Sequence, residues 1–282
     1  MRHENGLQDN FDDGTVALGA GTDTFSPIAI EVYGHIGLDF VWLDFEHAGP
    51  SPYDAPVIEE LTRAGEAAGI DLLIRIPSGD PPLIRKVLDA GARTLLIPRV
   101  ESAGEVEQAI EAARFTYGDS PGERGVGIGR TTTWGNSVER QPQIENDSVM
   151  VGAMIENASA VSNLEDILDV SGLGFVFIGP ADLSVSLGHP WQWDHPEVTE
   201  TVEHIVATAT DSGVPVGGIT TDAASAIDGI EQGYQLLHIG GDISSAQAVL
   251  SERLKDIREA RNSDTTQSNA NEMGGSIGRG GE

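Results

Sequence analysis

The feature that most constrains the fold is a regular alternation of short apolar runs and amphipathic segments. Eight runs rich in Val, Ile, Leu and Phe occur along the chain, at 16–20, 40–44, 72–76, 94–98, 151–156, 175–179, 214–219 and 236–240. Continuous apolar runs are typical of parallel strands that are buried on both faces. The stretches between them, such as 54–68, 82–90 and 196–212, have helical periodicity. Eight such repeats predict a closed (β/α)8 TIM barrel of the α/β class, with a doubly wound open sheet as the alternative.

Two segments do not follow this alternation of strands and helices. The stretch 117–147 is long and contains many glycine, arginine and threonine residues, together with Trp134. Long loops in compact domains are usually functional or disordered, and we expect this one to be ordered over the barrel mouth. The segment 262–282 is polar, glycine-rich and aperiodic. We therefore predict one barrel domain over 1–261 and a disordered polar tail over 262–282.

The charge balance limits the partners of this chain. It has 16 basic and 45 acidic residues, which gives a net charge of −29. Such a surface repels nucleic acid and anionic membranes, so we expect neither as a partner. The acidic residues are spread along the chain, which favours a halophilic origin over a merely acidic mesophilic protein. Cysteine is absent, no apolar run reaches membrane-spanning length, and the N-terminus lacks a signal-peptide pattern. These features predict a cytoplasmic protein.

Polar side chains stand at the C-terminal ends of four predicted strands. In a β/α barrel these ends form the catalytic rim, and burying unpartnered polar groups there would be costly. The residues are Asp44, Glu46, His47, Arg75, Glu156 and Asp182.

Glu156 and Asp182 follow neighbouring predicted strands. Two carboxylates in one pocket repel each other unless a proton or a cation lies between them. Oxygen ligands suit Mg²⁺ or Mn²⁺, so we predict that this pair holds a divalent metal ion. The alternative is that each carboxylate pairs with an arginine or caps a helix.

The other rim residues have two interpretations each. Arg75 either stabilises the barrel through a buried ion pair or stabilises an oxyanion or a substrate carboxylate. His47 is either held by structural hydrogen bonds or acts as a general base that Asp44 orients, since the two are three residues apart.

The scarcity of lysine limits the possible chemistry. Schiff-base aldolases need a lysine inside the barrel, and this chain has lysines only at positions 86 and 255, both within predicted helices. This distribution argues against imine chemistry and favours metal-assisted chemistry. The remaining histidines show no zinc-ligand spacing, and we interpret them as surface or packing residues: His35, His189, His195, His204 and His238.

These rim residues, in this order, resemble the HpcH/HpaI aldolase family of metal-dependent pyruvate aldolases. The resemblance extends from about residue 5 to about residue 261, and its segments include LDFEHAGPSPYD, GERGVG and, most specifically, MIENASAVSNLEDILDVSGLGFVFIGPADLSVSLG. It implies a phosphoenolpyruvate/pyruvate-type TIM barrel.

The resemblance implies an activity and a set of roles. The activity is cleavage of a 4-hydroxy-2-oxo acid to pyruvate and an aldehyde, with Mg²⁺ or Mn²⁺, or alternatively Co²⁺. The metal ligands fall on Glu156 and Asp182, and the catalytic histidine, aspartate and arginine on His47, Asp44 and Arg75. The pyruvate-binding turn comprises Gly179, Pro180, Ala181 and Asp182. It also implies a homo-oligomer, commonly a hexamer. Two other hypotheses remain: a CoA-thioester lyase of the citrate lyase β type and a non-catalytic barrel subunit.

Overall fold

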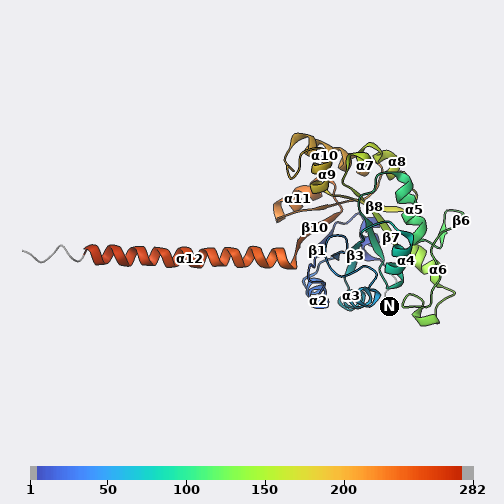
Figure 1. Cartoon of the computed structure of the whole chain (residues 1–282), viewed down its shortest axis with the longest axis horizontal. Coiled ribbons are helices and arrows are strands. Elements are labelled where there is room, and N and C mark those ends of the chain that lie inside the picture. The colour runs from blue at the N-terminus through green and yellow to red at the C-terminus, as the bar shows by residue number, and fades with distance from the viewer. Residues whose placement is uncertain (1–4, 275–282) are drawn as a thin grey trace, which may run out of the picture. The chain divides into compact units, whose positions relative to one another are not determined.

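The computed structural model describes the backbone of residues 5–274 and the side chains of residues 5–261. Eight parallel strands close into a barrel, surrounded by helices (Figure 1). Around the barrel the order is β1-β10-β9-β8-β7-β4-β3-β2. Each barrel strand therefore pairs with the next barrel strand along the chain, and β10 pairs with β1. This closure confirms the predicted TIM barrel and rules out the open sheet. The barrel strands are β1 (Ala17–Gly21), β2 (Phe40–Asp44), β3 (Asp71–Arg75), β4 (Thr94–Ile97), β7 (Met150–Ile155), β8 (Leu173–Ile178), β9 (Val216–Ile219) and β10 (Leu236–Gly241).

The helices begin and end where local sequence signals predict. α3 has a proline in its first turn and ends at Gly69, which adopts φ 71°. The helices at 54–68, 82–90 and 196–212 are confirmed to within one residue at each end. The helical elements are α1 (Gly6–Asp12), α2 (Pro27–Ile36), α3 (Ala55–Ala68), α4 (Pro81–Asp89), α5 (Ala103–Ala113), η1 (Thr133–Gly135), α6 (Gln141–Ser148), α7 (Ala158–Ser162), α8 (Leu164–Leu168), α9 (Pro180–Ser186), α10 (Pro196–Asp211), α11 (Ala223–Gln232) and α12 (Asp242–Gly274).

Glycine and phenylalanine pair across neighbouring strands inside the barrel. Gly152 pairs with Phe175, and Gly217 pairs with Phe177, in the strand register. A Cβ atom on Gly152 would lie 2.3 Å from the Phe175 ring. Both rings are fully buried. In the barrel interior, each of these phenylalanine rings occupies the space that the neighbouring glycine leaves free. This explains why glycines occur within otherwise apolar strands.

α1 covers the end of the barrel where the strands begin. The Leu7 side chain is fully buried within the barrel-interior cluster, and its N–H donates to Asp71 Oδ2 at 3.1 Å. The Asn5 side-chain amide donates to Thr94 Oγ1 and to the Ser148 carbonyl, both at 3.0 Å. Asp71 and Thr94 are the first residues of their strands. The opposite end, where the strands finish, therefore remains as the mouth.

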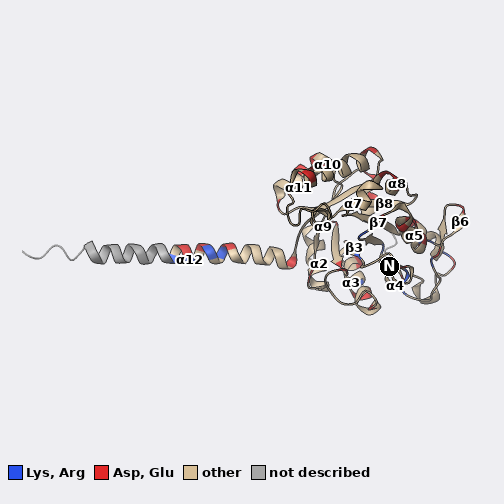
Figure 2. Cartoon of the chain, turned by 45° about the horizontal axis from the view of Figure 1, so that its top comes forward, with Lys and Arg blue, Asp and Glu red and all other residues tan. Residues whose placement is uncertain are grey.

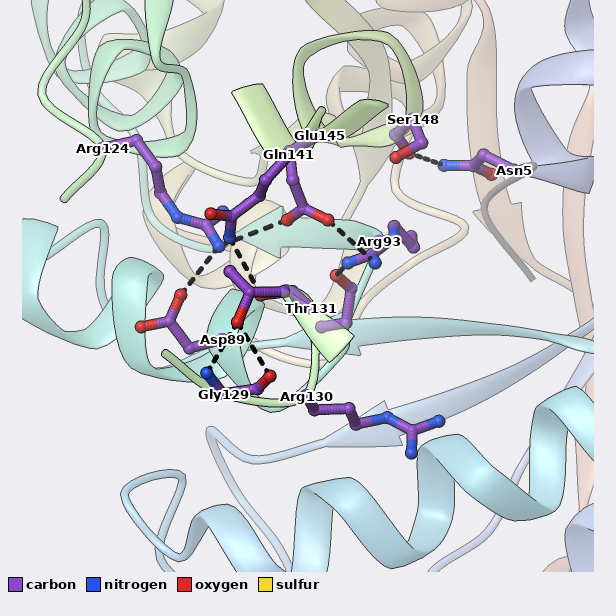
Figure 3. A network of polar contacts seen from close by, with 12 residues as sticks. Asn5, Asp89, Arg93, Arg124, Gly129, Arg130, Thr131, Gln141, Glu145 and Ser148 are labelled. Carbon is purple, nitrogen blue, oxygen red and sulfur yellow. Dashed lines mark hydrogen bonds and ion pairs between the residues drawn. The ribbon is translucent and has the colours of Figure 1, made fainter. Parts of the chain in front are cut away.

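The 117–147 loop lies at the closed end, so its predicted position over the mouth is wrong. Arg124 Nη2 donates to Asp89 Oδ1 at 2.9 Å and to Glu145 Oε2 at 3.3 Å, and Arg93 Nη2 lies 2.9 Å from Glu145 Oε1 (Figure 3). Asp89 ends α4 and Arg93 immediately precedes β4, and both points lie where strands begin. The physical reason is topological: this loop runs from a helix end to a strand start, and such loops lie opposite the catalytic rim.

The chain divides into a barrel unit, 1–241, and a second unit, 242–282. In the second unit α12 is a single helix from Asp242 to Gly274. Helical backbone therefore continues where the sequence predicted a tail from residue 262, because no proline interrupts this stretch and glycines begin at Gly274. Residues 275–282 lie outside the described residues, and the predicted disorder there stays a prediction.

The charges lie mainly on the outer helices. Figure 2 shows acidic residues on α5 and α10 and few basic residues on the barrel unit. Within the described part of the chain, no helix combines the length and the apolar character needed to cross a membrane.

Candidate active site

The structure brings the predicted rim residues to the mouth of the barrel. Asp44 is the last residue of β2, and Arg75 is the last residue of β3. Glu156 directly follows β7, and Asp182 lies in the first turn of α9, which follows β8. These four strands are neighbours in the barrel, in the order β8-β7-β4-β3-β2 with β4 between them. Their C-terminal ends therefore present the side chains to one rim.

Asp44 and Arg75 form a two-point ion pair. They are direct partners in the β2–β3 register. Arg75 Nε donates to Asp44 Oδ1 at 2.9 Å, and Arg75 Nη2 donates to Asp44 Oδ2 at 2.6 Å. Burial acts to raise the pKa of Asp44, but the hydrogen bonds and charge of Arg75 bring it below its ordinary value. Both groups are therefore charged, and the guanidinium plane is fixed by the fork geometry.

The predicted contact between the Asp44 carboxylate and the His47 ring is replaced by a backbone contact. Asp44 Oδ1 accepts from the backbone N–H groups of Glu46 at 3.0 Å and of His47 at 3.4 Å. The carboxylate is already engaged by Arg75 from the adjacent strand, and it therefore shapes the turn that carries His47. Asp44 therefore contacts the Arg75 guanidinium and the His47 backbone N–H, and does not contact the imidazole.

Glu46, a rim residue without a predicted role, lies against both Arg75 and His47. Its Oε2 atom lies 3.1 Å from Arg75 Nη1 and 3.6 Å from His47 Nε2. The His47 side chain is 64% exposed, whereas that of Glu46 is 10% exposed. Burial raises the pKa of Glu46, and the charges of Asp44 and Asp182 push it in the same direction. The carboxylate that faces the His47 ring is thus that of Glu46.

Arg75 is held by further contacts. Its guanidinium carbon lies 5.4 Å from the centre of the Trp42 ring, and Nη1 lies 3.7 Å from Met154 Sδ. Burial acts to lower the pKa of Arg75, but the carboxylates of Asp44 and Glu46 raise it above its ordinary value. The result is a fixed, permanently charged cation at the mouth.

Glu156 is a buried carboxyl group with one satisfied oxygen. Only 3% of the residue is exposed. Its Oε1 atom accepts from the Arg99 backbone N–H at 2.6 Å, and Arg99 adopts φ 55°, an uncommon conformation for a non-glycine residue. Its Oε2 atom has no hydrogen-bond partner among the described residues. A Cβ on Gly179 would lie 2.6 Å from this oxygen, so glycine keeps the space beside it open.

The electrostatics of Glu156 disfavour an isolated negative charge. Burial raises the pKa of its carboxyl group to about 7. The negative charges of Glu46 and Asp182 act in the same direction, and the Arg99 N–H acts against them. A cation beside Oε2 would reverse this balance, because it would stabilise the ionised carboxylate.

The turn from Gly179 to Asp182 follows β8 and is hydrogen-bonded to the end of β7. The Gly179 N–H donates to the Ile155 carbonyl at 3.2 Å, and Pro180 opens α9. The N–H groups of Ala181 and Asp182 lie in the first helical turn, where backbone donors have no partner within the helix. The Asp182 side chain is exposed at the mouth. This turn offers backbone donors and a carboxylate to the same space.

The residues present fit a hard divalent cation. The donor set consists of carboxylate oxygens, one of which is buried and unpartnered among the described residues. Such donors suit Mg²⁺ or Mn²⁺, with water completing the coordination. Glu156 and Asp182 would hold the ion.

Comparison with known proteins identifies relatives along most of the chain. The HpcH/HpaI aldolase/citrate lyase family pattern matches residues 22–248. A 2-keto-3-deoxy-L-rhamnonate aldolase of Escherichia coli O157:H7 is 34% identical over 251 residues, which cover 88% of this chain and 91% of the relative.

Solved structures agree with the sequence relatives. An HpcH/HpaI aldolase/citrate lyase family protein from Burkholderia cenocepacia J2315 has a TM-score of 0.83 at 32% identity, covering 90% of this chain and 99% of that one. The citrate synthase SbnG has a TM-score of 0.79 at 29% identity, covering 93% and 100%. Relatives that are named aldolases are carbon–carbon lyases. This chain, a carbon–carbon lyase, therefore belongs to the HpcH/HpaI aldolase/citrate lyase family.

Proposed function

We propose that this protein is a class II aldolase that cleaves a 4-hydroxy-2-oxo acid into pyruvate and an aldehyde. In this proposal Glu156 and Asp182 hold the divalent metal ion. The observation that carries it is the buried Glu156 carboxyl group, whose Oε2 atom has no partner among the described residues. An unmatched charge in such a position costs several kcal/mol, so the group is suited to meet a cation.

The metal we propose is Mg²⁺ or Mn²⁺, with Co²⁺ as a further candidate. When bound, such an ion supplies positive charge where negative charge develops on the 2-oxo oxygen of the substrate. The lysines support a metal-dependent route over an imine. Lys86 lies in the last turn of α4, at the closed end of the barrel, and Lys255 lies in α12.

The chain's own groups would bind and orient the substrate. The N–H groups of Ala181 and Asp182 are suited to donate hydrogen bonds to the substrate carboxylate at the start of α9, beside Gly179 and Pro180. Arg75 would contact the 2-oxo oxygen, and its two hydrogen bonds to Asp44 hold the guanidinium in place. A rigid cation needs little reorganisation as charge develops, which lowers the barrier.

His47 is the group we assign as general base. It removes the proton from the 4-hydroxyl group, directly or through a water molecule. The resulting C4 oxygen forms the aldehyde carbonyl as the C3–C4 bond breaks, and that electron pair moves to C3–C2 and the 2-oxo oxygen. Protonation of C3 then yields pyruvate. Glu46, 3.6 Å from His47 Nε2, would stabilise the imidazolium that forms.

A 2-keto-3-deoxy sugar acid is the substrate class we propose. Such acids carry the required 2-oxo and 4-hydroxyl groups, and the Escherichia coli relative is named for one of them. The test is a retro-aldol screen in molar KCl with Mn²⁺, coupled to pyruvate detection. It compares 2-keto-3-deoxy-L-rhamnonate and other 4-hydroxy-2-oxo acids with malyl-CoA and citramalyl-CoA. Pyruvate release from the sugar acids supports the proposal, while turnover of the thioesters alone would replace it with a citrate lyase β-type activity.

We also propose a homo-oligomer. Five apolar residues share one face of α12, and an amphipathic helix is stable when such a stripe is buried. They are Ile243, Ala246, Leu250, Leu254 and Ile257. A hexamer is the assembly that the family resemblance suggests, and light scattering at several protein concentrations measures it. A cytoplasmic location stays a prediction.

A further inference from the structure

A second cluster of metal-ligating side chains lies outside the rim residues. It is formed by His189, in the segment between α9 and α10, by His195, which is the N-cap of α10, and by Glu197 in the first turn of α10. One ligand atom of each residue lies within 4.8 Å of the others. The residues are six and two positions apart in sequence, a spacing that gave no zinc signature. The fold brings them together.

The three side chains are already close to one another. The two imidazole rings are stacked, with centroids 3.5 Å apart and an interplanar angle of 17°. His189 Nε2 lies 2.8 Å from Glu197 Oε2, and the Glu197 backbone N–H donates to His195 Nδ1 at 3.3 Å. Both histidines are partly buried, and the Glu197 side chain is exposed. The cluster is therefore accessible to a small ion from solvent.

The backbone around the cluster is held by hydrogen bonds. Ser184, which is fully buried in α9, accepts the His189 N–H at its carbonyl at 2.7 Å and the Trp191 N–H at its hydroxyl at 3.2 Å. The His195 N–H donates to the Gln192 carbonyl at 3.1 Å. Both histidine backbones are thus fixed, so ligand binding would require only side-chain adjustment, which keeps the entropic cost small.

We propose that His189, His195 and Glu197 form a binding site for a divalent transition metal ion of the Zn²⁺ class. Two imidazole nitrogens and one carboxylate oxygen are the donors that Zn²⁺ prefers, whereas Mg²⁺ and Mn²⁺ favour all-oxygen sets. Tetrahedral Zn²⁺ places its ligand atoms about 3.3 Å apart. The 2.8 Å separation between His189 Nε2 and Glu197 Oε2 would widen slightly. The other ligand-atom distances, which are at most 4.8 Å, would close by up to about 1.5 Å, within the range of side-chain rotation.

The site would link two elements near the mouth. A metal ion there would join the segment that follows α9 to the start of α10, and α9 carries Asp182. The inference does not depend on the proposed function, because the donors are different residues of a different chemical type. The competing occupant is a proton: a protonated His189 would form an ion pair with Glu197 and bind no metal.

The test is calorimetric titration of Zn²⁺ into the full-length chain carrying Glu156→Gln and Asp182→Asn, so that the rim carboxylates do not contribute. Millimolar Mg²⁺ is present to occupy the acidic surface. We expect one saturable Zn²⁺ site per chain. Adding His195→Ala should weaken binding by about tenfold or more, and His189→Gln should do the same. Co²⁺ in place of Zn²⁺ should give a visible absorption band that both histidine substitutions remove.

His204→Ala is the matched control, because His204 is an exposed histidine about two turns beyond Glu197 on α10. It should leave the Zn²⁺ affinity unchanged. Equal affinity with and without His195 and His189 would overturn the proposal, as would the absence of any saturable Zn²⁺ binding to the chain that retains all three ligands. The latter result would assign the cluster to the His189–Glu197 ion pair.

Discussion

Replacing Glu156 by glutamine should stabilise the metal-free protein at alkaline pH. Burial raises the pKa of Glu156 from an ordinary value of 4.5 to about 7. Between these pH values the folded protein retains a proton that the unfolded chain releases, so this group makes stability fall as pH rises. A pKa shift of this size corresponds to a loss of about 3 kcal/mol in the free energy of unfolding. This loss is complete above pH 7 and absent below pH 4.5. Glutamine can keep the bond from the Arg99 N–H and carries no charge.

The assay is chemical denaturation in molar KCl with a chelator, at equal protein concentrations. The free energy of unfolding of Glu156→Gln relative to the parent should rise by up to about 3 kcal/mol between pH 5 and pH 8. Glu203→Gln, at an exposed position of α10, should show no comparable pH-dependent difference. Adding Mn²⁺ at pH 8 should stabilise the parent and leave Glu156→Gln unchanged. A difference that stays constant from pH 5 to pH 8 would refute the assignment of an unmatched buried charge to Glu156.

Three further substitutions test other parts of the account. Gly152→Ala places a Cβ 2.3 Å from the Phe175 ring and should cost about 1–3 kcal/mol of stability, and an unchanged melting temperature would contradict the packing described. Asp44→Asn breaks the two-point ion pair with Arg75, and it should reduce the free energy of unfolding by on the order of 3 kcal/mol and lower kcat/KM. If thermal melts show unchanged stability and steady-state assays show unchanged kcat/KM, the pair is dispensable. His47→Ala should lower the rate of cleavage by about 100-fold or more while calorimetry shows Mn²⁺ binding preserved, and unchanged turnover would remove His47 from the mechanism.

The fold could be predicted because its strands are buried on both faces. Such strands are continuous apolar runs, so all eight are visible in the sequence. The 117–147 loop was placed wrongly because its composition suggested function, whereas its position is decided by topology. It joins the end of α5 to the start of β7, and such a connection lies at the closed end. The glycine–phenylalanine pairs could not be predicted, because they depend on the register between strands.

The positions of the candidate site residues could be predicted because these residues follow strand ends, but the pairing between them could not. Asp44 and His47 are close in sequence, which suggested that they interact. The structure pairs Asp44 instead with Arg75, 31 residues away, because the two are opposite each other in the β2–β3 register. Glu46 was visible between Asp44 and His47 and was given no role. Its position, facing both Arg75 and His47, emerges only when the turn after β2 is known.

The central claim is that Glu156 and Asp182 hold the metal ion on which cleavage depends. The most direct measurement is pyruvate release from a 4-hydroxy-2-oxo acid by exhaustively chelated protein in molar KCl, before and after Mn²⁺ or Mg²⁺ is added. The account predicts that chelation abolishes release, that either ion restores it, and that the chain with Glu156→Gln and Asp182→Asn is not restored. Release that persists after complete chelation, or full restoration in that variant, would contradict it.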